Sequence, residues 1–181
     1  MLKGKKVFLR PVKKSDLSVF LKWFNDLEVI QYLGSIRPIT EIEEERWIEE
    51  LGTIRKESDI VFVIEAVNSK KPIGTCGFHH IDYKNQNADF GIAIGEKRYW
   101  NKGYGTEAAE LMINYGFTQL NLNRISSAVF DFNERSIKLH KKVGFQEEGR
   151  RRKYVFINGR FHDSILFGLL REEWKERRKI S

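Results

Sequence analysis

The 181-residue chain holds 32 lysines and arginines against 25 aspartates and glutamates, a formal net charge of +7, and 41% hydrophobic residues. This composition excludes a disordered chain, and the single cysteine, Cys76, excludes intramolecular disulfides and a multi-cysteine zinc site. No signal-peptide-like segment opens the sequence and no run of about 18 apolar residues occurs, so we expect one soluble, cytoplasmic domain over residues 1–181 with no membrane partner.

The first half of the chain predicts a strand, two helices and then three strands. Residues 6–12 form the first strand, and a helix follows Ser15 or Asp16 because its apolar residues recur every three or four positions. Thr40 begins the second helix, since Glu43 three residues later completes a capping-box pattern. The strands that follow are predicted over 59–66, 72–81 and 88–95, the first two joined as a hairpin.

The second half alternates helices and strands and closes with a hairpin. Its elements are a helix over 106–120, a strand over 124–130, a helix over 134–143 and strands over 153–157 and 163–170. Gly144 is well placed to end the helix over 134–143. Asn158-Gly159 is a strong signal for a two-residue hairpin turn. Residues 171–181 are expected to form a solvated tail or a frayed helix. This order of elements predicts a mixed α/β fold.

The segment YWNKGYGTEAA (99–109) places a glycine-rich bend directly before a helix. Glycines allow close backbone approach and the first turn of a helix offers unpaired N–H groups, so the bend is a candidate phosphate-binding nest. Lys102 precedes both Gly103 and Gly105, which excludes a P-loop, and no third glycine supports a dinucleotide fingerprint. For an isolated Gly-x-Gly, an ordinary strand-to-helix turn is the alternative.

Together with the later motif NERSIKLHKKVGF (133–145), the bend resembles the two-part signature of the GNAT superfamily of acetyl-CoA-dependent N-acetyltransferases. The segments FLRPVKKSDL, NADFGIAI and GRRRKYVFINGRFHDSILFGL resemble the bacterial branch that holds spermidine N-acetyltransferases and ribosomal-protein N-terminal acetyltransferases. The resemblance covers nearly the whole chain. It implies a GNAT fold, in which helices flank a central, mostly antiparallel twisted sheet with a splayed pair of parallel strands.

The resemblance also implies acetyl-CoA as cosubstrate and no metal. The backbone N–H groups of the bend would hold the pyrophosphate, the strand before it would pair with the pantetheine arm, and Asn133 would contact the cofactor from the far side of the cleft. Trp100 stands where the family often has arginine or glutamine. The cofactor-binding residues carried over are Gly91, Ile92, Ala93, Ile94, Trp100, Asn101, Lys102, Gly103, Tyr104, Gly105, Thr106 and Asn133.

Acetyl transfer to an amine needs a proton acceptor, a stabilised oxyanion and a proton for the leaving sulfur. By resemblance, Asp89 would draw the proton from the amine through a water; a solvated strand-edge charge is the alternative. A backbone N–H near Ile92 or Ala93 would stabilise the oxyanion. His140 stands where relatives have a tyrosine and is the candidate acid, with a packing role or water-mediated transfer as alternatives.

Two adjacent histidines raise a metal hypothesis that strand geometry weakens. His79 and His80 point to opposite faces of an extended strand, and Cys76 lies about 13 Å from His80 along it. One histidine of the pair can line the acceptor pocket, although ordinary strand residues are the simpler interpretation. His162, beside Asp163, is interpreted as structural.

The acceptor is less well defined than the reaction. Glu41, Glu44 and Glu45 concentrate negative charge on a helix near the acceptor entrance of relatives, where they would attract a polyamine or a basic peptide terminus. We expect a small polyamine such as spermidine as the acceptor, with a protein N-terminus as the alternative. A solvated helix face would show the same charge run.

Two other classes of function stay open. The net positive charge and the cluster GRRRKY (149–154) suit an RNA-binding module, but no aromatic RNA-binding motif accompanies them, so we expect no nucleic-acid partner. A non-catalytic sensor that binds coenzyme A is the other possibility. The resemblance implies a homodimer or a higher homo-oligomer.

Overall fold

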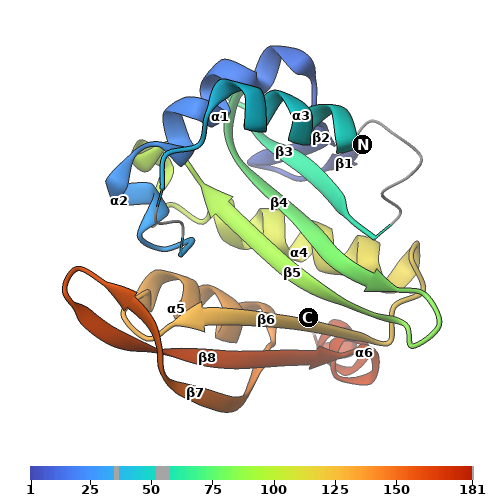
Figure 1. Cartoon of the computed structure of the whole chain (residues 1–181). Helices are drawn as coiled ribbons and strands as arrows, with labels where there is room; N and C mark the ends of the chain where they lie inside the picture. Colours follow the sequence, from blue (N-terminus) through green and yellow to red (C-terminus); the bar gives the residue numbers. More distant parts are fainter. Residues whose placement is uncertain (35–36, 52–57, 181) are drawn as a thin grey trace.

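The computed structural model describes residues 1–34, 37–51 and 58–180, and side chains as far as residue 177. Within these residues, eight strands form one sheet in the order β1-β2-β3-β4-β5-β6-β8-β7 (Figure 1). The strands are β1 (Leu2–Lys3), β2 (Val7–Pro11), β3 (Ile60–Ala66), β4 (Lys71–Asp82), β5 (Asn87–Ile94), β6 (Arg124–Phe130), β7 (Gln146–Ile157) and β8 (Arg160–Leu170). Neighbouring strands are antiparallel except β5 and β6, which are parallel. The sheet confirms the expected mixed, mostly antiparallel fold.

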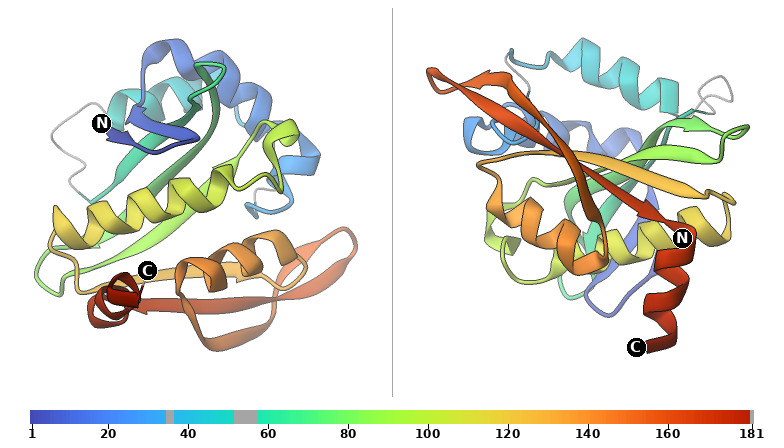
Figure 2. Two further views of the ribbon diagram at one scale, coloured as in Figure 1. Left: turned by 180° about the vertical axis from the view of Figure 1, so that it is seen from behind. Right: turned by 90° about the horizontal axis from the view of Figure 1, so that it is seen from below.

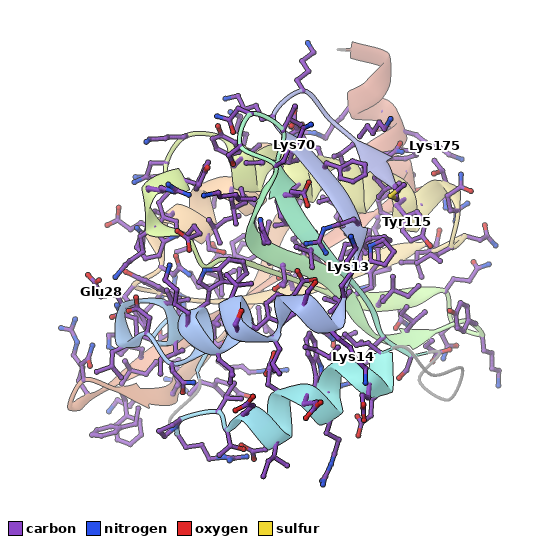
Figure 3. The ribbon with its side chains drawn as sticks, turned by 90° about the horizontal axis from the view of Figure 1, so that it is seen from above. Lys13, Lys14, Glu28, Lys70, Tyr115 and Lys175 are labelled. Carbon is purple, nitrogen blue, oxygen red and sulfur yellow. The ribbon has the colours of Figure 1, made fainter. Side chains whose placement is uncertain are left out.

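Helices cover both faces of this sheet. They are α1 (Leu17–Phe24), α2 (Leu27–Ile30), α3 (Glu41–Leu51), α4 (Tyr104–Thr118), α5 (Glu134–Val143) and α6 (Arg171–Ile180). On one face, α1 and α3 lie side by side (Figure 3) and pack Phe20, Trp23 and Ile48 against the sheet. On the other face, α4 and α5 lie over the strands (Figure 2), and Met112 and Ile113 of α4 enter the larger core.

Several element ends follow the short-range signals in the sequence. Thr40 and Glu43 cap α3 reciprocally, because the Glu43 N–H donates to Thr40 Oγ1 at 3.2 Å and the Thr40 N–H to Glu43 Oε2 at 3.1 Å. Gly144 ends α5 with a left-handed φ of 109°. Asn158 and Gly159, with φ of 52° and 80°, form the turn between β7 and β8. These predictions are confirmed.

The final hairpin is longer than the sequence pattern indicates. β7 begins at Gln146 rather than at residue 153, and β8 begins at Arg160 rather than at residue 163. The added part of β7 is charged and largely exposed, since β7 is the last strand in the sheet order and pairs on one side only. Its strand character therefore comes from pairing with β8 and not from its own apolar pattern.

The chain beyond β8 is a helix rather than a tail. Residues 171–180 form α6, which projects from the end of the sheet (Figure 2), and residue 181 lies outside the described residues. The Trp174 ring packs 5.2 Å from the Phe117 ring of α4, and Arg171 Nε donates to the Leu122 carbonyl at 2.7 Å. These contacts fix the start of α6 on the body of the protein.

The two parallel strands separate after a short ladder. β5 and β6 are paired from Asn87 and Arg124 to Asp89 and Ser126. Beyond that point β5 continues beside β4 while β6 continues beside β8, so the strands diverge (Figure 1). The opening between them faces the start of α4 and the start of α5. No helix among the described residues is long and apolar enough to cross a membrane.

Candidate active site

A cavity of about 580 Å³ occupies the opening between β5 and β6, and we call it the larger cavity. Its walls come from both strands, the bend before α4, α5 and α2. The predicted cofactor residues that line it are Gly91, Ile92, Ala93, Ile94, Trp100, Asn101, Gly103, Gly105, Thr106 and Asn133. Lys102 and Tyr104 are not among its lining residues: the Lys102 carbonyl accepts a hydrogen bond from Lys6, and Tyr104 packs 4.9 Å from the Tyr99 ring.

The bend before α4 has the conformation that an anion site needs. Asn101 and Gly103 both have left-handed backbone, with φ of 58° and 83°, and Gly103 is the N-cap of α4 with no described side chain capping the helix. The first amides of α4 therefore point outward without intrahelical partners. Successive N–H groups arranged in this way form a concave site for phosphate oxygens, which fits a diphosphate.

Neighbouring side chains hold the bend in place. The Trp100 indole donates to the Ile94 carbonyl at 2.7 Å, and the Arg135 guanidinium lies 3.9 Å from the Trp100 ring. Asn133 caps α5 by accepting the Ser136 N–H at 3.2 Å. Trp100 thus links the end of β5 to the bend, and the Arg135 guanidinium packs against the face of the same indole ring.

A carboxylate clamps the start of α4 to the turn between β1 and β2. Glu107 accepts the backbone N–H groups of Lys5, Lys6 and Val7 at 2.9, 2.7 and 2.8 Å. Lys6 in turn donates its ammonium to the Lys102 carbonyl at 2.9 Å. Through these contacts the N-terminal residues fix the position of the bend and place a positive charge beside it.

His140 is buried in the wall of the larger cavity, with 2% of its surface exposed. Its Nδ1 donates to the Ser136 carbonyl at 2.8 Å, and its Nε2 lies 2.9 Å from Ser127 Oγ, which is also 3.0 Å from the Phe90 carbonyl. Burial lowers the pKa of His140, opposed by the hydrogen bond to the Ser136 carbonyl. The ring is therefore neutral at neutral pH, and the Ser127 hydroxyl joins it to β5 across the opening. The role of His140 as acid stays a prediction.

Asp89 does not line the larger cavity and is the cross-strand partner of His79. Its side chain is 57% exposed, and its Oδ2 lies 3.1 Å from Nδ1 of His80. The structure thus places Asp89 in contact with solvent and a histidine, while its predicted role as proton acceptor stays untested.

A second cavity of about 470 Å³, the smaller cavity, lies between the sheet and the α1–α3 layer. Its lining residues are Phe24, Ile30, Leu33, Arg37, Ile39, Glu43, Glu44, Trp47, Val61, Thr75, Cys76, Gly77, His79, Gly91, Ile92 and Ala93. The segment Gly91–Ala93 of β5 and Leu33 line both cavities. The two cavities therefore meet at β5, close to where it leaves β6.

Glu44 is the acid of α3 that is buried beside the smaller cavity. Its residue exposure is 5%, burial raises its pKa, and its Oε1 has no hydrogen-bond partner among the described residues. Glu43 also lines the cavity, but Arg37 and Thr40 bind its carboxylate and lower its pKa to about 2. Glu41 and Glu45 are exposed. The helical spacing of Glu44 with Ile48 is the sequence signal for this inward position.

The histidine pair does not belong to a metal-binding cluster within the described residues. No group of three or more His, Cys, Asp or Glu side chains in that part of the chain is arranged to hold a metal ion. His79 lines the smaller cavity, whereas the His80 side chain is 83% exposed. The prediction that one of the pair lines a pocket thus applies to His79. His162 is buried and its Nδ1 lies 3.0 Å from Asp131 Oδ1.

Comparison with known proteins identifies the family. Residues 6–146 match the model described as the acetyltransferase (GNAT) domain, so the chain belongs to the GNAT acetyltransferase family. The uncharacterized N-acetyltransferase p20 of Bacillus licheniformis is 38% identical over 92% of this chain and 93% of its own length. The spermidine N(1)-acetyltransferase of Escherichia coli K12 is 30% identical over 93% and 88%. The protein is an acetyl-CoA-dependent N-acetyltransferase.

Solved structures agree with this assignment. The spermidine N-acetyltransferase of Vibrio cholerae in complex with CoA and spermine has a TM-score of 0.87 and 26% identity, covering 95% of this chain and 99% of that chain. A dodecameric structure of that enzyme has a TM-score of 0.82 and 26% identity, covering 96% and 99%.

Proposed function

We propose that the protein transfers the acetyl group of acetyl-CoA to a primary amine of a small polyamine such as spermidine. Acetyl-CoA would occupy the larger cavity and the amine the smaller one, so that the two meet at Gly91–Ala93. The observation that carries the choice of acceptor is Glu44, a buried carboxylate whose Oε1 lacks a partner among the described residues.

The larger cavity suits the cofactor in both charge and shape. The outward amides of the bend, from Asn101 to Thr106, would bind the diphosphate, and the exposed edge of β5 would pair with the pantetheine arm. When bound, acetyl-CoA supplies a thioester that an unprotonated amine can attack. Asn133 and Arg135 stand on the opposite wall, where the start of α5 closes the cavity.

The smaller cavity suits a chain of methylene groups with a second positive charge. Phe24, Trp47 and Ile92 supply apolar walls, while Glu44 would hold an ammonium group that does not react. A carboxylate buried without a partner is costly, and a cation would remove that cost. The spermidine acetyltransferase relatives support this acceptor class.

His140 remains our candidate for returning a proton to the departing sulfur, through the Ser127 hydroxyl at the cavity wall. Because burial lowers the pKa of His140, we expect this contribution to fall as pH rises. A thiol has a pKa near 8.5 and is a tolerable leaving group without help, so the contribution is modest.

The acceptor is tested by the release of free thiol from acetyl-CoA with spermidine, spermine, aminoglycosides and short N-terminal peptides. Glu44→Gln should raise the KM for spermidine about tenfold, or about 1.4 kcal/mol, and leave acetyl-CoA binding unchanged. Glu45→Gln, on the exposed face of the same helix, is the matched control. Turnover only with peptides would identify a protein N-terminal acetyltransferase, and acetyl-CoA binding without any turnover would identify a sensor.

We also propose that the protein acts as a cytoplasmic homodimer or larger homo-oligomer. The dodecameric structure of the Vibrio cholerae relative supports self-association, and the continuous eight-stranded sheet of the described residues supports one catalytic domain. Size-exclusion chromatography with light scattering measures the assembly, and a monomer at micromolar concentration would contradict it.

A further inference from the structure

An ammonium group must lose a proton before its nitrogen can attack a thioester, because a lysine-type amine has a pKa near 10.4. A residue that accepts this proton has to reach the place where the two cavities meet. Asp89 does not line either cavity, and the Glu43 carboxylate is already bound by Arg37 and Thr40.

His79 is the imidazole at this meeting point. On the face of the sheet under α1 and α3, Gly77 of β4 pairs with Gly91 of β5, and His79 is the next residue of β4 on the same face. Its ring leans over Gly91: a Cβ built on Gly91 would lie 3.5 Å from His79 Nε2 and 3.6 Å from its Cδ2. Gly91 lines both cavities, so Nε2 faces the segment where amine and thioester would meet.

Asp59 stands behind the other nitrogen of this ring. Its Oδ1 lies 3.8 Å from His79 Nδ1, and its side chain is 14% exposed. The same oxygen accepts the backbone N–H of His80 at 3.2 Å, which fixes the position of the carboxylate. At 3.8 Å the contact is too long for a hydrogen bond, and it places a carboxylate on the side of the ring opposite to Gly91.

Other charged groups face His79 from each neighbouring element. They are Asp59 before β3, His80 and Asp89 at the ends of β4 and β5, and Arg37, Glu43 and Glu44 across the smaller cavity. Asp89 is bound to His80, and Glu43 to Arg37. Glu44 is the carboxylate that would bind the non-reacting ammonium group of the polyamine. His79 is then the group in a position to accept the proton of the reacting amine.

We propose that His79 is the catalytic base that accepts the proton of the acceptor amine, with Asp59 as its positioning residue. This inference rests on the proposed function. One N–H bond of the ammonium breaks and its proton moves to His79 Nε2, leaving the electron pair on nitrogen. That pair forms the new C–N bond as the C–S bond breaks and its electrons leave with sulfur. The nitrogen then loses a second proton, whose positive charge balances the negative charge of the departing thiolate. His79 returns the first proton to solvent.

The first test compares His79→Gln with His80→Gln in steady-state kinetics with spermidine. At about pH 7, His79→Gln should lower kcat about 100-fold or more. The loss should shrink near pH 9.5, where more of the amine is already unprotonated. Acetyl-CoA affinity and the unfolding midpoint should stay at their wild-type values. His80→Gln is the matched control and should keep the wild-type kcat, since its ring is exposed.

Two further readouts separate a base from a structural residue. Imidazole in solution should restore part of the activity of His79→Ala, which a packing role would not allow. In protein without acetyl-CoA, spermidine should shift the NMR signals of the His79 ring and leave those of His80 in place. Asp59→Asn should give an intermediate kcat.

The results that would overturn the inference are distinct from those that would overturn the proposed function. If the wild-type protein acetylates spermidine and His79→Gln has the same kcat and pH profile, His79 is not the base. The proposed function would stand, and Glu44 or water would accept the proton. An unmoved His79 signal on addition of spermidine would refute the base in the same way. Wild-type protein that binds acetyl-CoA but acetylates no amine would refute both proposals.

Discussion

Replacing Gly95 with alanine should strongly destabilise the protein, because the residue has no room for a side chain. A Cβ at Gly95 would lie within 2.7 Å of Cγ, Cδ1 and Cδ2 of Trp23. Carbon atoms in contact prefer about 3.5 to 4.0 Å, so the indole must move by an ångström or more. Trp23 is 1% exposed, its ring lies 5.8 Å from the Phe20 ring at a tilt of 39°, and its indole donates to Glu96 at 3.1 Å, so its movement disturbs the α1 core.

Overpacking of this kind costs about 1 to 3 kcal/mol, and we expect the upper end for Gly95→Ala. In a chain of this size that loss lowers the melting temperature by about 6 to 12 °C. Gly149→Ala is the control, since the nearest atom to its added Cβ, Leu166 Cδ1, is 4.0 Å away. Thermal unfolding by circular dichroism measures both variants. Melting temperatures within about 2 °C of each other would refute the steric reasoning.

Three further outcomes test other contacts. Glu107→Ala should lower the free energy of unfolding by about 2 to 3 kcal/mol in urea, because three backbone N–H groups lose a charged acceptor, while exposed Glu110→Ala should have little effect. Cys76 is buried and burial raises its pKa, so native protein should not react with Ellman's reagent and unfolded protein should release one equivalent. Burial holds the pKa of His140 below 6.5, so the unfolded chain binds this proton more readily. Stability should therefore fall as pH drops below about 6.5, and less steeply in His140→Gln; equal slopes would contradict the reasoning.

The elements that could be predicted from the sequence are those with local causes. Reciprocal caps at Thr40, a left-handed residue at Gly144 and the Asn158-Gly159 turn each depend on a few neighbouring residues, and each is observed. The charged first part of β7 has no such signal, because pairing with β8 makes it a strand. Long-range pairing of this kind does not appear in a local pattern.

The candidate site divides in the same way. The phosphate-binding bend is visible in the sequence because glycines and a helix start are local features, and residues such as Gly103 and Gly105 line the larger cavity. The positions of Asp89, outside the cavities, and His79, over Gly91, depend on register between strands. Strand alternation does not describe His80, because its left-handed φ of 50° lies in a register shift of β4 and brings its ring to Asp89, the cross-strand partner of His79.

The shared segment Gly91–Ala93 has a kinetic consequence. Two cavities that approach one strand segment from different sides can be filled at the same time, so neither substrate has to leave before the other arrives. Double-reciprocal plots at several fixed concentrations of the second substrate should then intersect, whereas a covalent acetyl-enzyme would give parallel lines. A single molecule that joins coenzyme A to a polyamine through a short linker should span both cavities. It should bind far more tightly than either half, because the second half binds at a high effective concentration.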